Sequence, residues 1–293
     1  MTTADTNVIA RAGTAGRAPL GLGSFGVWMT SQAASPELAI AVERLGYGAI
    51  WLGSADGDLR LAEKLLEATS TLTVATGIVN IWTYPPGPVG AAWHRVEQAH
   101  RGRLLLGIGV GHREVTGASY ARPYQALTGY LDTLDMVGVP ASRRVRPRSA
   151  RRCCGCPRNA APERTRTWSL PSTSAEPAES SATGRCWHPQ KVVLDPDPAR
   201  GRALARQQVL LHLNLANYVA NLRRFGYTDT DLAAPGSDRL VDDLILHGTA
   251  DEVTAKLREH LQAGADHVPV QLLTGNDADP LPGLTALAER LLS

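Results

Sequence analysis

The sequence lacks the features of a membrane-spanning or exported chain. No stretch approaches the roughly 18 unbroken apolar residues that a bilayer span needs, and residues 1–24 form a Thr/Ala/Gly-rich lead without the apolar core of a signal peptide. The composition also excludes collagen, coiled coils and small disulfide scaffolds. We therefore expect a soluble, cytoplasmic protein whose residues 1–21 are a disordered lead.

An excess of charge of one sign is also missing. The 293 residues carry 30 basic and 28 acidic side chains, a net charge of +2. This balance predicts neither a nucleic-acid partner nor an anionic membrane surface. With 43% hydrophobic residues, the length fits one large globular domain or two small ones.

Outside residues 143–189 the chain alternates short apolar runs with amphipathic stretches. The runs are nearly continuous, which is typical of strands buried on both faces; they span residues 25–29, 49–53, 72–81, 104–111, 191–194 and 267–273. Helices are predicted between them, over residues 35–46, 58–68, 88–100, 199–225 and 251–263. This βα alternation and the length favour an α/β fold, a TIM-like (β/α)8 barrel, over a doubly wound sheet. Two of the eight strands are missing from the pattern.

The missing strands coincide with a segment of different composition. Between Arg143 and Pro189 there are ten arginines and three glutamates, a net charge of +7, so the rest of the chain carries −5. All four cysteines lie there too. Cys153, Cys154 and Cys156 could suggest a metal or redox site, but zinc ligands come as separated pairs with a second pair at a set distance, so we expect no metal site.

A shift in reading frame accounts for this composition. If the stretch is read one nucleotide out of frame, a cysteine codon, which begins TG, conceals a codon ending in TG. Cys153 before Cys154 then conceals a leucine, as does Cys186 before Trp187. The 27 arginines against three lysines indicate GC-rich codons. With such codons, the shifted frame of residues 147–189 encodes an amino-acid sequence of globular composition, with a strand, a Leu-Gly-Pro turn, a helix and a second strand.

We therefore expect two compensating insertions or deletions, near Val145 and near Pro189, that put residues 146–189 out of frame. Strands 5 and 6 of a barrel would then be scrambled, and the fourth and seventh strands would be left with unpaired edges. The predicted organisation is a single barrel domain over residues 22–290, interrupted by a poorly ordered 146–189. A natural low-complexity insertion is the alternative.

Several motifs, in order and spacing, resemble the luciferase-like monooxygenase superfamily, and within it the branch of oxidoreductases that use coenzyme F420. The matching stretches are Leu-Gly-Ser-Phe-Gly-Val-Trp at 22–28, Leu-Gly-Tyr-Gly-Ala-Ile-Trp-Leu-Gly at 45–53, Val-Ala-Thr-Gly-Ile-Val-Asn-Ile-Trp at 74–82, Leu-Leu-Gly-Ile-Gly-Val-Gly-His at 105–112, and Gly-Ala-Asp-His-Val at 264–268. The resemblance covers residues 22–142 and 190–290.

The resemblance implies a barrel that binds a deazaflavin at the carboxyl ends of its strands. Family members carry a non-prolyl cis peptide behind the ring, and the matching residues here are Gly77, Ile78, Val79 and Asn80. Gly107, Gly109 and Gly111 follow a buried strand, where small residues let a ring or phosphate approach the backbone. An ordinary glycine bulge and close strand packing are the alternative interpretations of the two sets.

Five further residues are candidates for chemistry or substrate binding. His112 matches the position where several relatives carry an acidic glutamate, and a histidine could protonate or orient a substrate oxygen; Glu114 is the second candidate donor. Trp28, Trp51 and Trp82 follow three successive strands and could wall the substrate pocket. A structural histidine and aromatic core packing are the corresponding alternatives.

The expected function is hydride transfer between coenzyme F420 and a small organic substrate, by a chain that could form homodimers. An FMN-dependent monooxygenase of the same fold is one alternative. An inactive, frame-damaged family member is another, because Arg148, Ser149, Ala150 and Arg151 stand where relatives place the loop that binds the cofactor phosphate. A basic nucleic-acid binder lacks the interleaved aromatic residues of known modules.

Overall fold

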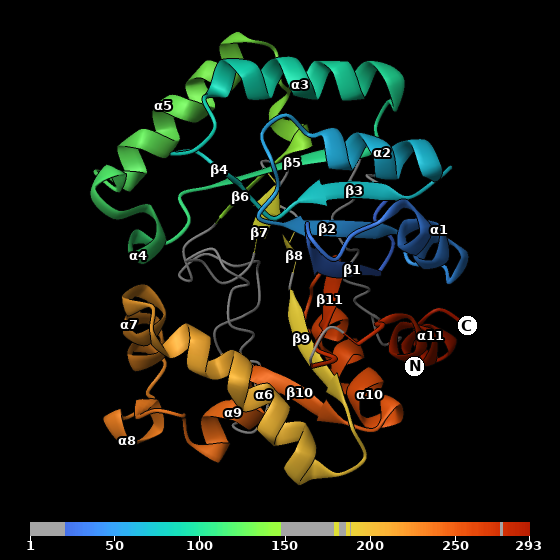
Figure 1. Cartoon of the computed structure of the whole chain (residues 1–293), viewed down its shortest axis with the longest axis vertical. Coiled ribbons are helices and arrows are strands. Elements are labelled where there is room, and N and C mark those ends of the chain that lie inside the picture. The colour runs from blue at the N-terminus through green and yellow to red at the C-terminus, as the bar shows by residue number, and fades with distance from the viewer. Residues whose placement is uncertain (1–20, 148–178, 182–185, 188, 276–277) are drawn as a thin grey trace, which may run out of the picture.

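The computed structural model of the chain describes residues 21–147, 179–181, 186–187, 189–275 and 278–293. Most of the predicted lead and most of the segment 146–189 lie outside these residues, so the predicted disorder and frame shift are not tested by the described part. Figure 1 shows the described elements, with strands at the centre and helices around them.

The N-terminal half contains the four strands that the apolar runs predict. They are β1 (Phe25–Thr30), β2 (Ala49–Gly53), β3 (Thr73–Thr76), which a two-residue break separates from β4 (Val79–Asn80), and β5 (Leu104–Gly109). All pair in parallel. The predicted strand 72–81 is therefore two short strands, interrupted at Gly77 and Ile78.

The helices between these strands begin and end within two residues of the predicted positions. α1 (Pro36–Arg44) starts at Ser35, whose hydroxyl accepts the Leu38 N–H at 3.2 Å, and its first position is a proline. Gly46 ends it in the left-handed region with φ of 89°. α2 (Arg60–Ala68) and α3 (Pro86–Ala99) follow β2 and β4.

The structure of the C-terminal half differs from the prediction in two places. The single helix expected over 199–225 is two helices, α6 (Pro198–Leu213) and α7 (Ala216–Arg224), with a break at residues 214–215. The apolar run before Gly248 also contains an unpredicted strand, β10 (Ile245–Gly248), beside the predicted β9 (Gln190–Leu194) and β11 (Val268–Leu272). β10 follows α9 (Asp238–Leu244) without a turn residue between them, so the run carried no boundary signal.

The remaining elements complete the layer of helices outside the sheet. They are α4 (Arg113–Thr116), the 3-10 turns η1 (Gly117–Ser119) and η2 (Ala141–Arg143), α5 (Pro123–Met136), α8 (Asp229–Leu232), α10 (Ala250–Gln262) and α11 (Leu281–Leu291). A capping box formed by Thr249 and Glu252 starts α10, and the predicted stop, Gly264, follows it.

The described strands form one mostly parallel sheet in the order β10-β9-β11-β1-β2-β3-β5-β6-β7-β8, with β4 paired to β5. β6 (Arg144–Pro147) is parallel to β5, whereas β7 (Glu179–Ser181) and β8 (Cys186–Trp187) are joined antiparallel. The predicted open edges are therefore wrong: β5 pairs with β6, and β9 lies between β10 and β11. The predicted α/β fold class is confirmed.

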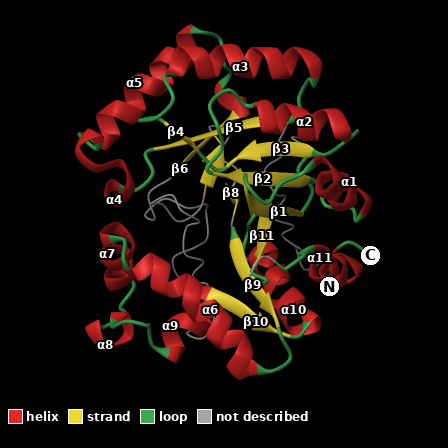
Figure 2. Ribbon diagram, viewed as in Figure 1, coloured by secondary structure: helices red, strands yellow, loops and turns green. Residues whose placement is uncertain are grey.

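The core has an inner and an outer part because strand side chains alternate between the two faces of the sheet. Trp28, Trp51 and Trp187 belong to an inner cluster that lies among the strands. Val27 and Ile50, on the alternate strand positions, belong to the larger outer core beneath the helices. Figure 2 shows these helices around the strands. Both faces are thus buried, as the continuous apolar runs predict.

Contacts between side chains of distant strands stabilise the inner cluster. The Trp51 indole N–H donates to His267 Nε2 at 3.0 Å, and the other ring nitrogen of His267 lies 2.9 Å from the carbonyl of Gly23. The rings of Trp51 and Trp187 meet edge to face at 5.2 Å, and Trp187 forms an isolated parallel bridge with His267. Strands from both halves of the chain therefore meet at these side chains.

Candidate functional site

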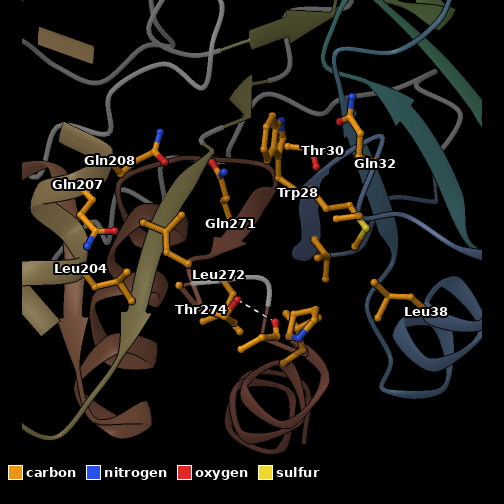
Figure 3. Close-up of a pocket in the computed structure, with 18 residues that line it drawn as sticks. Trp28, Thr30, Gln32, Leu38, Leu204, Gln207, Gln208, Gln271, Leu272 and Thr274 are labelled. Carbon is orange, nitrogen blue, oxygen red and sulfur yellow. Dashed lines mark hydrogen bonds between the residues drawn. The ribbon is translucent and has the colours of Figure 1, made fainter. Parts of the chain in front are cut away.

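A cavity of about 610 Å³ lies beside the carboxyl ends of β1 and β11, against α6 (Figure 3). Its volume is in the range of pockets that bind a small organic ligand. Trp28 and Thr30 of β1, Gln271 of β11 and Gln207 and Gln208 of α6 line it, together with apolar residues such as Met29, Leu38, Leu204 and Leu272. The cavity therefore combines an apolar wall with a few polar groups.

Two buried polar atoms at this cavity have no hydrogen-bond partner among the described residues: Nε1 of Trp28, a donor, and Oε1 of Gln271, an acceptor. Figure 3 shows the side chains of Trp28, Gln271 and Gln208 pointing to the same side, with Gln271 between the other two. Unpaired buried polar atoms are uncommon and costly, so a pair of them at a cavity wall indicates a ligand position.

The residues expected behind the ring lie beside Trp28. The peptide bond between Gly77 and Ile78 is cis, as the resemblance implies. A Cβ atom at Gly77 would lie 3.3 Å from Nε1 of Trp28, and the Gly77 N–H donates to the carbonyl of Leu52 at 2.7 Å. Val79 and Asn80 continue as β4, paired to β5. Contact of these four residues with a cofactor stays a prediction.

The three glycines at the end of β5 have a packing reason. A Cβ atom at Gly107 would lie 1.8 Å from the carbonyl oxygen of Thr76, and one at Gly109 would lie 2.6 Å from the Ile78 side chain. Gly111 has a φ of 58°, a conformation that glycine adopts without strain. The glycines are thus explained by close packing of β3, β4 and β5, and their contact with a cofactor stays a prediction.

His112 follows the end of β5 and is buried, with 8% of its surface exposed. Burial lowers its pKa below the ordinary 6.5, and the facing side chains of Glu114 and Asn217 only partly oppose this. Neither ring nitrogen has a well-oriented hydrogen bond to a described residue. The ring packs on Tyr218 at 5.4 Å. At neutral pH His112 is therefore an uncharged imidazole, able to accept a proton.

Glu114 is engaged elsewhere. Its Oε1 accepts the backbone N–H of Ala216 at 2.9 Å, at the first residue of α7, and this bond lowers the pKa of the carboxyl. An ionised carboxylate that caps a helix is a poor proton donor. The roles of His112 and Glu114 as proton donors stay predictions.

The three tryptophans take different positions. Trp28 lines the cavity, whereas Trp51 is fully buried in the inner cluster. Trp82 lies after β4, donates from its indole to the carbonyl of Val110 at 2.8 Å and packs on Tyr120. Of the three tryptophans, therefore, only Trp28 lines the cavity.

The sequence did not predict the positions of Gln271, Gln208 and Lys191 at or near the cavity. Gln271 interrupts the apolar run of β11, and Lys191 stands in the buried run of β9, so a polar residue inside an apolar strand was the available signal. Among the residues that the structure describes, no group of three or more His, Cys, Asp or Glu side chains could hold a metal ion. Cys153, Cys154 and Cys156 lie outside those residues.

Comparisons with known proteins agree with the resemblance. Residues 20–138 match the model of the luciferase-like monooxygenase family. A comparison with curated proteins gives no match. Within the described residues, no helix has the length and apolar character needed to cross a membrane.

Solved structures of similar fold include F420-dependent and FMN-containing proteins. An F420-dependent secondary alcohol dehydrogenase, in complex with an F420–acetone adduct, has a TM-score of 0.61 at 12% identity, over 91% of this chain and 97% of that one. The F420-dependent tetrahydromethanopterin reductase of Methanopyrus kandleri has 0.58 at 14%, over 92% and 98%. The oxygenating constituent of a 3,6-diketocamphane monooxygenase of Pseudomonas putida, in complex with FMN, has 0.52 at 14%, over 92% and 97%. At these identities the likeness establishes the fold.

Proposed function

We propose that this chain, whose residues 20–138 match the luciferase-like monooxygenase family, is an oxidoreductase that transfers a hydride between coenzyme F420 and a small organic substrate. The observation that carries the proposal is the cavity beside β1 and β11, where a donor on Trp28 and an acceptor on Gln271 have no partner among the described residues. The choice of F420 over FMN rests on the sequence motifs that resemble the F420 branch.

The residues of the cavity fit the ring end of such a cofactor. A deazaflavin ring presents carbonyl oxygens and a ring N–H, which match a donor such as Nε1 of Trp28 and an acceptor such as Oε1 of Gln271. Arg148–Arg151, where relatives bind the phosphate, lie outside the described residues, so the fit concerns the ring alone.

In this proposal the chain orients the reactants and handles one proton. When bound, the cofactor supplies or accepts the hydride. Trp28 donates to a ligand oxygen, Gln271 accepts from a ligand N–H, and the apolar wall excludes water. His112, which burial holds uncharged, does not line the cavity, so its proton exchange with a substrate oxygen rests on its match to the acidic position of relatives. The ring of His112 packs on Tyr218, which in turn packs on His212 of α6. Gln208 of the same helix lines the cavity.

Titration with F420 and with FMN, followed by the fluorescence of each free cofactor, tests the proposal. We expect saturable binding of F420, binding of FMN at least tenfold weaker, and loss of F420 binding in Trp28→Phe, which keeps the ring but removes the donor. Trp82→Phe, whose side chain lies away from the cavity, is the control.

Other results would select the alternatives. Preferential binding of FMN would favour an FMN-dependent monooxygenase. A chain that binds neither cofactor and melts without cooperativity would be an inactive family member. We further propose that the protein is cytoplasmic and acts on a small molecule without a nucleic-acid or membrane partner, and that it could form homodimers.

A further inference from the structure

Lys191 is a buried lysine that the proposed function does not use. Only 5% of its surface is exposed. On β9 it lies on the same face as Val193, two residues on, and Val193 packs with Val209 of α6 and Tyr218 of α7. The alternate residue Gln190 faces the other way and bonds His260 of α10. Lys191 therefore faces α6 and α7.

The same face carries the polar end of the cavity. Lys191 is the register partner of Gln271 on β11, so the two side chains leave the sheet on the same side. Gln271 lines the cavity together with Gln208 of α6 (Figure 3), and the side-chain amide of each glutamine carries N–H groups that can donate to an anion. Lys191 thus stands next to the Gln208–Gln271 end of the cavity.

No negative charge of a described residue compensates this lysine. Within the described ranges, its ammonium makes no hydrogen bond or ion pair with any carboxylate. The titratable group facing it is His212 of α6, which acts on it as another potential cation, and His112 lies one ring further, beyond Tyr218. His247 of β10 is paired with Asp242, and His260 lies on the opposite face. Glu114 is bound to the backbone of α7.

A buried cation without a counter-ion is costly, so such a group either loses its proton or waits for an anion. Burial lowers the pKa of Lys191 to about 7, and burial together with Lys191 lowers the pKa of His212 to about 3. An anion beside both groups would favour their charged forms and raise both pKa values. Anion binding here is therefore coupled to proton uptake.

We propose that Lys191 binds an oxyanion, a carboxylate or phosphate group of the substrate, at the Gln208–Gln271 end of the cavity. The assignment of the anion to the substrate rests on the proposed function; the anion site itself does not. The site narrows the substrate class to small organic molecules that carry an acidic group at one end.

The chain offers a direct test because it contains only three lysines, Lys64, Lys191 and Lys256. In full-length protein labelled with 13C-lysine, inorganic phosphate and acetate are titrated at pH 7.5 while the side-chain carbon signals are recorded. We expect the Lys191 signal, assigned by its loss in Lys191→Met, to move saturably and its pKa to rise by about one unit or more. Equal movement of all three signals, or none, would overturn the proposal.

Binding measured by calorimetry gives a second readout. We expect Lys191→Met to weaken phosphate or acetate binding by roughly tenfold or more, as for loss of a charged hydrogen bond, and the exposed control Lys256→Met to leave it unchanged. If Lys191→Met does not fold, Lys64→Met and Lys256→Met assign the Lys191 signal by elimination, and the titration of the unaltered chain still decides.

The source of the anion is decided by competition. We expect F420, if it binds, to occupy the chain together with acetate or phosphate. Mutual exclusion would assign the position to the cofactor tail and overturn the substrate assignment. Failure of F420 to bind, with Lys191 still responding to anions, would reject the proposed function and leave the anion site standing.

Discussion

At the scale of single residues, Gly107 shows how a motif can serve packing. The carbonyl of Thr76 occupies the space that a Cβ atom at Gly107 would need, and the Thr76 hydroxyl bonds both the N–H and the carbonyl of Gly107. Gly107→Ala forces β3 and β5 apart, so we expect a loss of about 3 kcal/mol in the free energy of unfolding. Urea denaturation measures it.

Gly129 provides the matched control. It lies in the middle of α5, and apart from the neighbouring residues and backbone of that helix, no described atom lies within 4 Å of the Cβ that alanine would add. Gly129→Ala should therefore stabilise the chain by about 0.5–1 kcal/mol through helix propensity. Equal effects of the two substitutions would mean that the contact with Thr76 is not what requires glycine at 107.

The ring of Tyr218 shields two histidines. It lies 5.4 Å from the ring of His112 and 4.7 Å from that of His212, both of which have pKa values lowered by burial. Tyr218→Leu admits water to both rings, so their pKa values should move up towards 6.5. Histidine ring titration by NMR measures the change; Tyr124→Leu, at an exposed tyrosine, should change neither value.

The sequence predicted the backbone conformation of single residues where a motif determines it. The cis bond between Gly77 and Ile78 is where the resemblance placed it. The sequence alone could not predict the surroundings of Lys191, Gln208 and Gln271, because these residues belong to β9, α6 and β11, which are distant in the chain. A single polar residue within an apolar run marks such a position without revealing its neighbours.

At the scale of elements, α7 depends on a residue from another part of the chain. Its N-terminal flank, Leu215, offers no side-chain cap, and Glu114 after β5 supplies the acceptor for the N–H of Ala216. Glu114→Ala should speed amide hydrogen exchange at residues 216–218 several-fold with little change in overall stability. Glu259→Ala, on α10, is the control, and unchanged exchange at 216–218 would contradict the capping role.

The break between α6 and α7 explains why the sequence predicted one helix there. Residues 202–225 contain no proline or glycine, and the apolar spacing continues through the break. What ends α6 is tertiary: Leu215 and Tyr218 turn into the cluster with Val209. Strands and capped helices were predictable because their signals are local; this turn was not.

At the scale of the whole molecule, buried histidines make stability depend on pH. Burial lowers the pKa of His212 to about 3 and those of His260 and His267 to about 4. The unfolded chain binds protons at these sites below about pH 6.5 and the folded chain does not, so stability is full above pH 6.5 and falls as the pH drops towards 4.

The expected slope near pH 5.5 is close to three protons, about 4 kcal/mol per pH unit. Urea denaturation as a function of pH measures it. His260→Gln should reduce the slope by about one proton. A slope near zero would mean that these rings are protonated in the folded state.

The coding DNA provides a test of the whole-chain organisation. Sequencing across codons 140–195 should reveal two compensating insertions or deletions, near the codons of Val145 and Pro189. The restored chain would then carry the strand and Leu-Gly-Pro turn concealed in residues 147–189. A confirmed reading frame would instead identify this segment as an insertion, with the described part of the fold unchanged.

The contact between Trp51 and Trp187 has an optical consequence. Two indoles with ring centres 5.2 Å apart and planes at 62° are close enough for their electronic transitions to couple. The pair should give a circular dichroism couplet that disappears when either ring is replaced by phenylalanine. Because one ring belongs to β2 and the other to β8, that signal reports in solution whether the chain beyond residue 185 has docked onto the N-terminal strands.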